Sequence, residues 1–177
     1  MNSHPNPYKQ IFSILNMEFQ EDDLVLGTVE KIEHMNVFVK LENGKTGMIV
    51  TSEIAPGRIK NLRAYVAPNK IIVCKVLRIS DNHIELSLRR VTSKEKKEVL
   101  TRHQQEKDIE MGLKSILQED FVEIAKKIKS EFKTLLNFLE KCQQDNSILK
   151  NYIPEKHLEK AIKLTEKKRK EVEVKKT

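Results

Sequence analysis

Hydrophobic residues between positions 24 and 91 recur at short intervals, and turn-forming residues interrupt them about every ten positions. Most of these apolar residues are β-branched, and in the segment NVFVKLE they alternate with polar ones. Such alternation predicts half-buried strands, here over residues 24–32, 36–42, 45–50, 70–80 and 83–91. With a short helical insertion after the third strand, this order predicts a small, closed, five-stranded Greek-key barrel.

Two pairs of turn-forming residues predict the connections between strands. Asn43 and Gly44 both tolerate a positive φ, so they predict a tight type I′ hairpin. Asp81 and Asn82 predict a second turn before the last strand. In that strand we expect two faces, Ile84, Leu86 and Leu88 on one and Glu85, Ser87 and Arg89 on the other.

The pattern changes to a helical one at Thr92. Thr92 and Glu95 have the spacing of a capping box, in which each side chain binds the other residue's backbone N–H. Apolar residues then follow at the helical spacing of about 3.6 residues, which predicts amphipathic helices packed into a small bundle. The positions are Ile109, Leu113, Ile116 and Leu117, then Phe121, Ala125, Ile128, Phe132, Leu135, Leu136 and Leu139, and finally Leu158, Ala161 and Ile162.

The expected organisation therefore has two principal domains. We expect an N-terminal extension over residues 1–17, a barrel over 18–91 and a helical domain over 92–170. Residues 171–177 would begin a linker or a further domain. The alternating EVEVK in that last segment is compatible with a solvated helix end or with the first strand of such a domain.

Charge and composition narrow the possible functions. The 177 residues include 33 basic and 26 acidic ones, and the net charge of +7 favours a polyanionic partner, although a solvated Lys/Glu surface has the same composition. The sequence lacks a glycine-rich phosphate loop, a catalytic Cys/His pair and any metal-ligand spacing among its five His and two Cys, so we expect neither an enzyme nor a metal or cofactor site. Without an apparent signal peptide or membrane span, a cytoplasmic protein is expected.

Basic residues and one aromatic residue are the candidate functional groups. Barrels of this kind bind single-stranded nucleic acid on their second and third strands, where aromatic rings stack on bases and cations contact phosphates. The candidate RNA-binding residues are Phe38, Lys40, Arg58, Lys60, Arg63, Lys75, Arg89 and Arg90. Two structural alternatives remain open: Phe38 as an ordinary packed residue, and the segment with Arg58, Lys60 and Arg63 as a turn that only closes the barrel.

The barrel segment resembles the S1-type subclass of OB folds. The similarity rests on Gly27-Thr28-Val29, Gly44-Lys45-Thr46-Gly47, Ser52-Glu53 and Ile84-Glu85-Leu86-Ser87-Leu88. Where RNA-binding members usually carry an aromatic residue and a glycine, this chain has Met35 and Asn36, and where many carry a His it has Val50. The resemblance thus implies an RNA-binding fold with fewer stacking groups than usual.

The segment SEIAPGRIKNLRAYV, with VCKVLRI, HIELSLRRVT and the helices, resembles the alpha-subunit family of archaeal and eukaryotic translation initiation factor 2. In eukaryotic members a serine of this turn is phosphorylated, and here that position is Ala55, so no phosphorylation is expected. Pro56-Gly57 replaces two arginines of the eukaryotic motif, which makes the chain similar to the archaeal branch.

This resemblance implies a function in translation initiation. Members join a gamma and a beta subunit and deliver initiator methionyl-tRNA to the small ribosomal subunit, and the barrel lies where it can contact mRNA. In the family a third α/β domain attaches to gamma. We expect this sequence to end where that domain would begin, either as a fragment or as a natural short form. A stand-alone S1-type RNA-binding adaptor in RNA decay or transcription is the alternative. A decoy for an initiation-factor kinase is disfavoured, because Pro56-Gly57 removes the arginines that such a mimic would keep.

Overall fold

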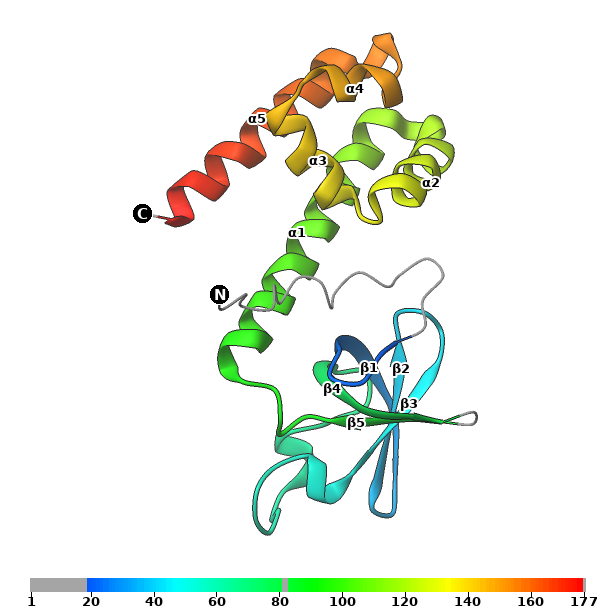
Figure 1. The fold of residues 1–177 in the computed structure, drawn as a ribbon, viewed down its shortest axis with the longest axis vertical. Coiled ribbons are helices and arrows are strands. Elements are labelled where there is room, and N and C mark those ends of the chain that lie inside the picture. The colour runs from blue at the N-terminus through cyan, green and yellow to red at the C-terminus, as the bar shows by residue number, and fades with distance from the viewer. Residues whose placement is uncertain (1–18, 81–82, 177) are drawn as a thin grey trace, which may run out of the picture. The chain divides into compact units, whose positions relative to one another are not determined.

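The computed structural model describes residues 19–80 and 83–176, which fall into two compact units that meet between Thr101 and Arg102. The extension expected over residues 1–17 and the turn expected at Asp81-Asn82 lie outside the described residues. The first unit contains the strands and the second contains most of the helices, which confirms a barrel followed by a helical domain (Figure 1).

The first unit is a closed barrel with the strand order β1-β2-β3-β5-β4. Strands β1, β2 and β3 form an antiparallel meander, β4 pairs with both β1 and β5, and a short parallel pairing of β3 with β5 closes the barrel. The strand bounds are Leu24–Glu33 (β1), Asn36–Leu41 (β2), Thr46–Val50 (β3), Ile71–Ser80 (β4) and His83–Ser87 (β5).

Alternation along the strands produces the barrel core. Val37, Val39 and Leu41 point inward from β2, whereas Phe38 and Lys40 point outward, as the sequence pattern predicts. Gly27 and Gly47 also occupy buried positions, where the side chains of Val39 and Leu86 fill the space that a larger residue would need. Two glycines of the S1-like pattern are therefore explained by close packing inside the barrel.

The β2–β3 hairpin differs from the expected type I′ turn. Only Gly44 has a positive φ, at 81°, whereas Asn43 does not. The Gly44 N–H donates to the Leu41 carbonyl at 2.9 Å, and the Leu41 N–H donates to the Lys45 carbonyl at 2.8 Å. These bonds define a three-residue loop in which the glycine follows an ordinary turn. The Asn43 side-chain oxygen accepts from the Lys45 N–H at 3.0 Å. This local hydrogen bond stabilises Asn43 in a backbone conformation other than the predicted one with positive φ.

Strand β5 is shorter than predicted and ends at Ser87. The next two N–H groups, of Leu88 and Arg89, donate to the carbonyl of Glu53 at 2.9 and 3.0 Å instead of to a neighbouring strand. Ser87, expected on the polar face, has an exposed fraction of 0%. Its hydroxyl donates to the same Glu53 carbonyl at 3.4 Å and accepts from the Arg90 N–H at 3.2 Å.

Helix α1 (Ser93–Leu117) begins at the predicted capping box. The Thr92 N–H donates to Glu95 Oε2 at 2.7 Å, and the Glu95 N–H donates to Thr92 Oγ1 at 3.2 Å, which confirms the box. The first turns of α1 belong to the barrel unit, since Val99 packs with Leu24 and Val73 of β1 and β4. The compact units therefore meet ten residues later than the change in sequence pattern suggests.

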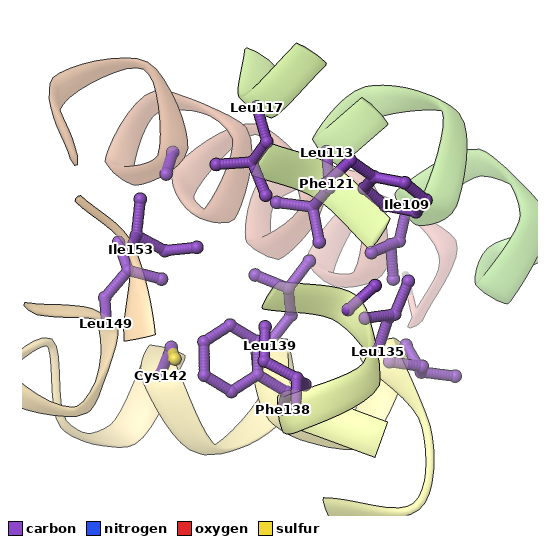
Figure 2. Close-up of a cluster of buried hydrophobic side chains, with 14 residues drawn as sticks. Ile109, Leu113, Leu117, Phe121, Leu135, Phe138, Leu139, Cys142, Leu149 and Ile153 are labelled. Atoms are coloured by element: carbon purple, nitrogen blue, oxygen red, sulfur yellow. The ribbon is translucent and has the colours of Figure 1, made fainter. Parts of the chain in front are cut away.

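The second unit packs the rest of α1 with α2 (Phe121–Phe132), α3 (Leu135–Gln144), α4 (Ser147–Tyr152) and α5 (Glu155–Lys176). Figure 2 shows the side chains that fill the space between these helices. The predicted positions of the apolar stripes are all buried in this cluster or packed against it: Ile109, Leu113, Ile116, Leu117, Phe121, Ala125, Ile128, Phe132, Leu135, Leu136, Leu139, Leu158, Ala161 and Ile162.

The middle set of predicted apolar positions, from Phe121 to Leu139, lies on two helices, α2 and α3. Lys133 ends α2 with a positive φ of 70°, and Thr134 caps α3 by accepting from the Asn137 N–H at 3.1 Å. The carboxylate of Glu106 binds the next two free N–H groups, those of Leu135 at 2.9 Å and Leu136 at 2.7 Å. An acidic side chain at a helix N-terminus is favourable for both hydrogen bonding and the helix dipole.

Helix α5 continues to Lys176 and includes the EVEVK segment. Of the two interpretations offered for that segment, the structure therefore contains the helix end and not a strand. Lys and Glu predominate along this part of the chain, and both residue types have high helix propensity, which outweighs the short apolar alternation.

Candidate nucleic-acid interface

The outer face of β1, β2 and β3 presents Phe38 and Lys40 as predicted. Phe38 is half-buried, and in the sheet register it pairs with Lys31 of β1 and Met48 of β3. The Lys31 Nζ lies over the Phe38 ring, 4.9 Å from its centroid. Sequence reasoning missed Lys31, because an irregularity in β1 between Val29 and Lys31 shifts it into register with the ring.

Two exposed apolar side chains extend this face at its edge. Met35 is 67% exposed and Val50 is 40% exposed, and these are the positions where the S1-like pattern usually has stacking groups. They are held together because the Thr51 hydroxyl, next to Val50, donates to the Met35 carbonyl at 2.7 Å. The face therefore offers one aromatic ring with flanking apolar and cationic groups.

A second group of cations lies on the segment between β3 and β4, which we call the basic turn (residues 56–63). It follows the short 3-10 helix η2 (Thr51–Glu53) and runs into η3 (Leu62–Ala64), and Figure 1 shows it as a loop outside the barrel strands. Gly57 has a φ of 79°, a conformation that favours glycine. The three basic side chains of this turn are exposed: Arg58, Lys60 and Arg63.

These cations have no acidic partner among the residues that the structure describes. Within residues 19–80 and 83–176, no ion pair or side-chain hydrogen bond involves Lys40 or the basic side chains of the basic turn. Their positive charge is therefore not neutralised within the described chain. Such charges are available for a polyanion at little desolvation cost, because they are exposed before binding.

Buried side chains anchor both ends of the basic turn. Before it, Ile54 and Ala55 are 2% and 6% exposed. Within and after it, Ile59 and Leu62 pack against the barrel core, and Val66 is fully buried. Ala55 is thus a packed methyl group.

Arg89 and Arg90 lie beside Glu53, the last residue of η2. Arg90 donates from Nε to Glu53 Oε2 and from Nη2 to Glu53 Oε1, each at 3.1 Å, which makes a two-bond pair. Arg89 Nε lies 3.5 Å from Glu53 Oε2. Both arginines, predicted as RNA contacts, therefore have an acidic partner that sequence reasoning did not find.

Lys75 of β4 also has a partner. Its Nζ donates to Glu95 Oε1 at 3.3 Å, so the lysine connects the barrel to the first turn of α1 within the same unit. The predicted site residues thus fall into two groups. Lys40, Arg58, Lys60 and Arg63 point to solvent and Phe38 contacts a cation on the outer face, whereas Lys75, Arg89 and Arg90 make ion pairs.

The Arg90 guanidinium, hydrogen-bonded to the carboxylate, holds the pKa of Glu53 below its ordinary value of 4.5, against the opposing effect of partial burial. A carboxyl group with a lowered pKa in the folded state stabilises the fold above its unfolded pKa, and this contribution is lost as the pH falls through the folded value.

Glu53→Gln should therefore destabilise the barrel in a pH-dependent way. We expect a loss of about 1 kcal/mol near pH 7, limited by the exposure of both arginines. The loss should become smaller as the pH falls below the ordinary pKa of a Glu carboxyl and through the lower folded-state value, where the wild-type carboxyl becomes protonated. Urea unfolding of both proteins across this pH range measures the difference. A difference that stays constant with pH would show that the charge of Glu53 does not contribute.

No group of three or more His, Cys, Asp or Glu side chains that could hold a metal ion occurs in the described part of the chain. Among the same residues, no helix is long and apolar enough to cross a membrane.

Comparison with known proteins agrees with the fold. The model of the S1 RNA binding domain matches residues 18–90, so the barrel belongs to that family of domains. The chain that carries it is a homologue of the alpha subunit of archaeal translation initiation factor 2. It is 33% identical to that subunit from Methanopyrus kandleri over 82% of this chain, and 36% identical to that from Methanosphaera stadtmanae over 71%.

Two solved structures are similar to most of this chain. The a/eIF2alpha chain of a Pyrococcus horikoshii a/eIF2alpha-aDim2p-rRNA complex matches 85% of this chain at 25% identity and a TM-score of 0.68, and 97% of that chain is covered. The intact alpha subunit from Pyrococcus abyssi matches 84% at 26% identity, also with a TM-score of 0.68, but only 61% of it is covered. Of the curated relatives, the chain spans 60% of the Methanopyrus and 53% of the Methanosphaera protein.

Proposed function

We propose that this chain acts as the alpha subunit of a cytoplasmic archaeal-type translation initiation factor 2 and that its barrel contacts RNA. The observation that carries the proposal is a set of exposed cations on an S1-type barrel that have no ion pair among the described residues: Lys40 beside Phe38 on the strands, and Arg58, Lys60 and Arg63 on the basic turn. The solved complex of a Pyrococcus relative with rRNA supports RNA as the partner. The relatives are named as a translation factor and not as an enzyme.

In this function the two cationic surfaces would have different tasks. The Phe38 ring would stack on a base, while Lys40 and the basic turn would contact phosphates of mRNA, tRNA or the small ribosomal subunit. Because the turn is anchored at both ends by buried residues, little conformational entropy is lost when it binds. Within an assembled factor, even weak contacts would suffice through high effective concentration.

Assembly with a gamma and a beta subunit is the finer part of the proposal. We expect that the chain alone will not co-elute with an archaeal gamma subunit in size-exclusion chromatography, whereas a fusion carrying the remaining C-terminal part of the Methanopyrus relative will. The family resemblance implies this, because gamma docking uses a third domain. If the fusion also fails while the chain retains RNA binding, a stand-alone S1-type RNA-binding adaptor is the better description.

Phe38→Ala should weaken binding to a single-stranded oligouridine by about fivefold to tenfold, because one base loses its aromatic platform. Fluorescence anisotropy at low salt measures the affinity. Phe38→Tyr is the matched control, since it keeps the ring and should bind nearly as well as the wild type. Equal affinities of the Ala variant and the wild type would assign Phe38 to packing with Lys31 and Met48.

A further inference from the structure

The contacts of Glu53 extend beyond a simple ion pair. Its carboxylate binds Arg90 through two hydrogen bonds of 3.1 Å, and its backbone carbonyl accepts from the N–H groups of Leu88 and Arg89 and from the Ser87 hydroxyl. Main chain and side chain of one residue are thus fixed to the same short segment after β5. The residue itself is only 9% exposed.

This fixed residue stands directly before the cationic surface. Ile54 and Ala55, both buried, separate Glu53 from Pro56, and the first exposed cation, Arg58, is five positions after Glu53. The contacts of Ile59 and Leu62 with the barrel core fix the far side of the same turn. The orientation of Arg58 is therefore set by an anchor on each side, and the Glu53 anchor is the polar one.

The same geometry restricts what Arg90 can do for RNA. A guanidinium that uses Nε and Nη2 for a carboxylate has already used its side edge, one of the two edges with which arginine can bind a phosphate through two bonds. To contact a phosphate through that edge, Arg90 would have to leave Glu53 and expose a mostly buried carboxylate close to the RNA. Such a carboxylate would repel the phosphate.

We propose that Glu53 and Arg90, with Ser87, form a latch that positions the basic turn for RNA, and that Arg90 is a positioning residue and not a phosphate contact. The inference rests on the proposed RNA-binding function. It gives Arg90 a different role from the one that its charge suggests, and it gives Glu53, the acidic residue of the S1-like pattern, a physical purpose.

The latch and simple electrostatics predict opposite effects of Glu53→Gln on RNA affinity. Glu53→Gln removes a negative charge, so if Arg89 and Arg90 were phosphate ligands held back by Glu53, the variant should bind RNA more tightly. Its salt dependence should then also be steeper, by about 0.7 in the slope of log K against log salt concentration for each further phosphate that is neutralised. If Glu53 instead holds the basic turn in place, the variant should bind about threefold to tenfold more weakly despite its more positive net charge.

Fluorescence anisotropy of the full chain with a single-stranded oligouridine, in a salt series, tests this, with circular dichroism confirming that each variant is folded at the temperature used. Glu123→Gln is the matched control, because Glu123 is an exposed residue of α2 and its replacement makes the same charge change in the other unit. Weaker binding by Glu53→Gln, with the control at or above wild-type affinity, supports the latch. Unchanged or tighter binding by Glu53→Gln overturns it.

A second variant shows whether a loss of RNA affinity comes from the shared Glu53–Arg90 contact or from an unrelated structural effect. Arg90→Gln removes the same latch from the other side, and together with Glu53→Gln it should weaken binding no more than the stronger single change, because the two residues act as one unit. Losses that add in the double variant would contradict a shared latch. If the wild-type chain binds no RNA at low salt, both the RNA-binding proposal and the latch fail, so this result is distinguishable from failure of the latch alone.

Discussion

A chain in which Arg58, Lys60 and Arg63 are all replaced by Glu is expected to bind single-stranded RNA on the order of a hundredfold more weakly at low salt. Each replacement removes a cation that has no partner within the described residues and puts an anion at the same exposed position. Exposed substitutions of this kind usually change the free energy of unfolding by no more than about 0.5 kcal/mol each. The loss should therefore appear in binding while the barrel remains folded.

The salt dependence identifies the cause of this loss. If the three side chains bind three phosphates, the slope of log K against log salt concentration should become shallower by about 2, at roughly 0.7 per phosphate for single strands. A variant with Lys126, Lys141 and Lys150 changed to Glu is the control, because these exposed lysines of the helical unit give the same change in net charge. Equal weakening in both variants would attribute the effect to net charge and remove the basic turn from the interface.

Those features of the fold that depend only on residues close together in the sequence could be predicted from local sequence patterns. Alternation of Val37, Val39 and Leu41 with Phe38 and Lys40 defines the two faces of β2, because strand periodicity depends only on neighbouring residues. The capping box of α1 could be predicted for the same reason, since its two residues are three positions apart.

Interactions between distant residues could not be predicted in this way. Glu53 and Arg90 are 37 residues apart, and no periodicity or spacing indicates that their side chains meet. The end of β5 at Ser87 is missed for the same reason, because the competing acceptor is the Glu53 carbonyl. The interruption between α2 and α3 has a local signal, the cap at Thr134, but the continuous apolar stripe conceals it.

In the candidate site, too, local features could be predicted from the sequence, whereas contacts between distant residues could not. Exposure of Arg58, Lys60 and Arg63 follows from their place on a turn with Pro and Gly, which sequence alone displays. The ion pairs of Lys75, Arg89 and Arg90 depend on which acidic residue the tertiary fold brings near each of them. A list of basic residues from sequence therefore combines exposed cations that have no ion pair among the described residues with cations that form ion pairs.

Gly47→Ala is expected to reduce the free energy of unfolding of the barrel by about 1 to 3 kcal/mol, through overpacking. The added methyl group would overlap Leu86 Cδ1, lie 2.9 Å from Leu86 Cγ and lie 3.3 Å from the Ile84 carbonyl oxygen. Leu86 is 1% exposed, so its side chain has little room to move away. This clash would act where β3 pairs with β5, the pairing that closes the barrel. Urea unfolding followed by circular dichroism measures the change.

A second substitution separates steric overlap from backbone strain. In Gly47→Ala combined with Leu86→Val, part of the lost stability should return relative to the sum of the two single changes, by about 1 kcal/mol, because the shorter side chain removes the overlapping methyl. Gly44→Ala is the control: its added methyl meets no atom within 4 Å, but its φ of 81° is unfavourable for alanine, so we expect a cost that Leu86→Val does not relieve. If the changes at Gly47 and Leu86 are simply additive, close packing against Leu86 is not the reason for glycine at position 47. If they couple as expected, the glycine is required by the approach of β5 to β3 and not by any backbone conformation of its own.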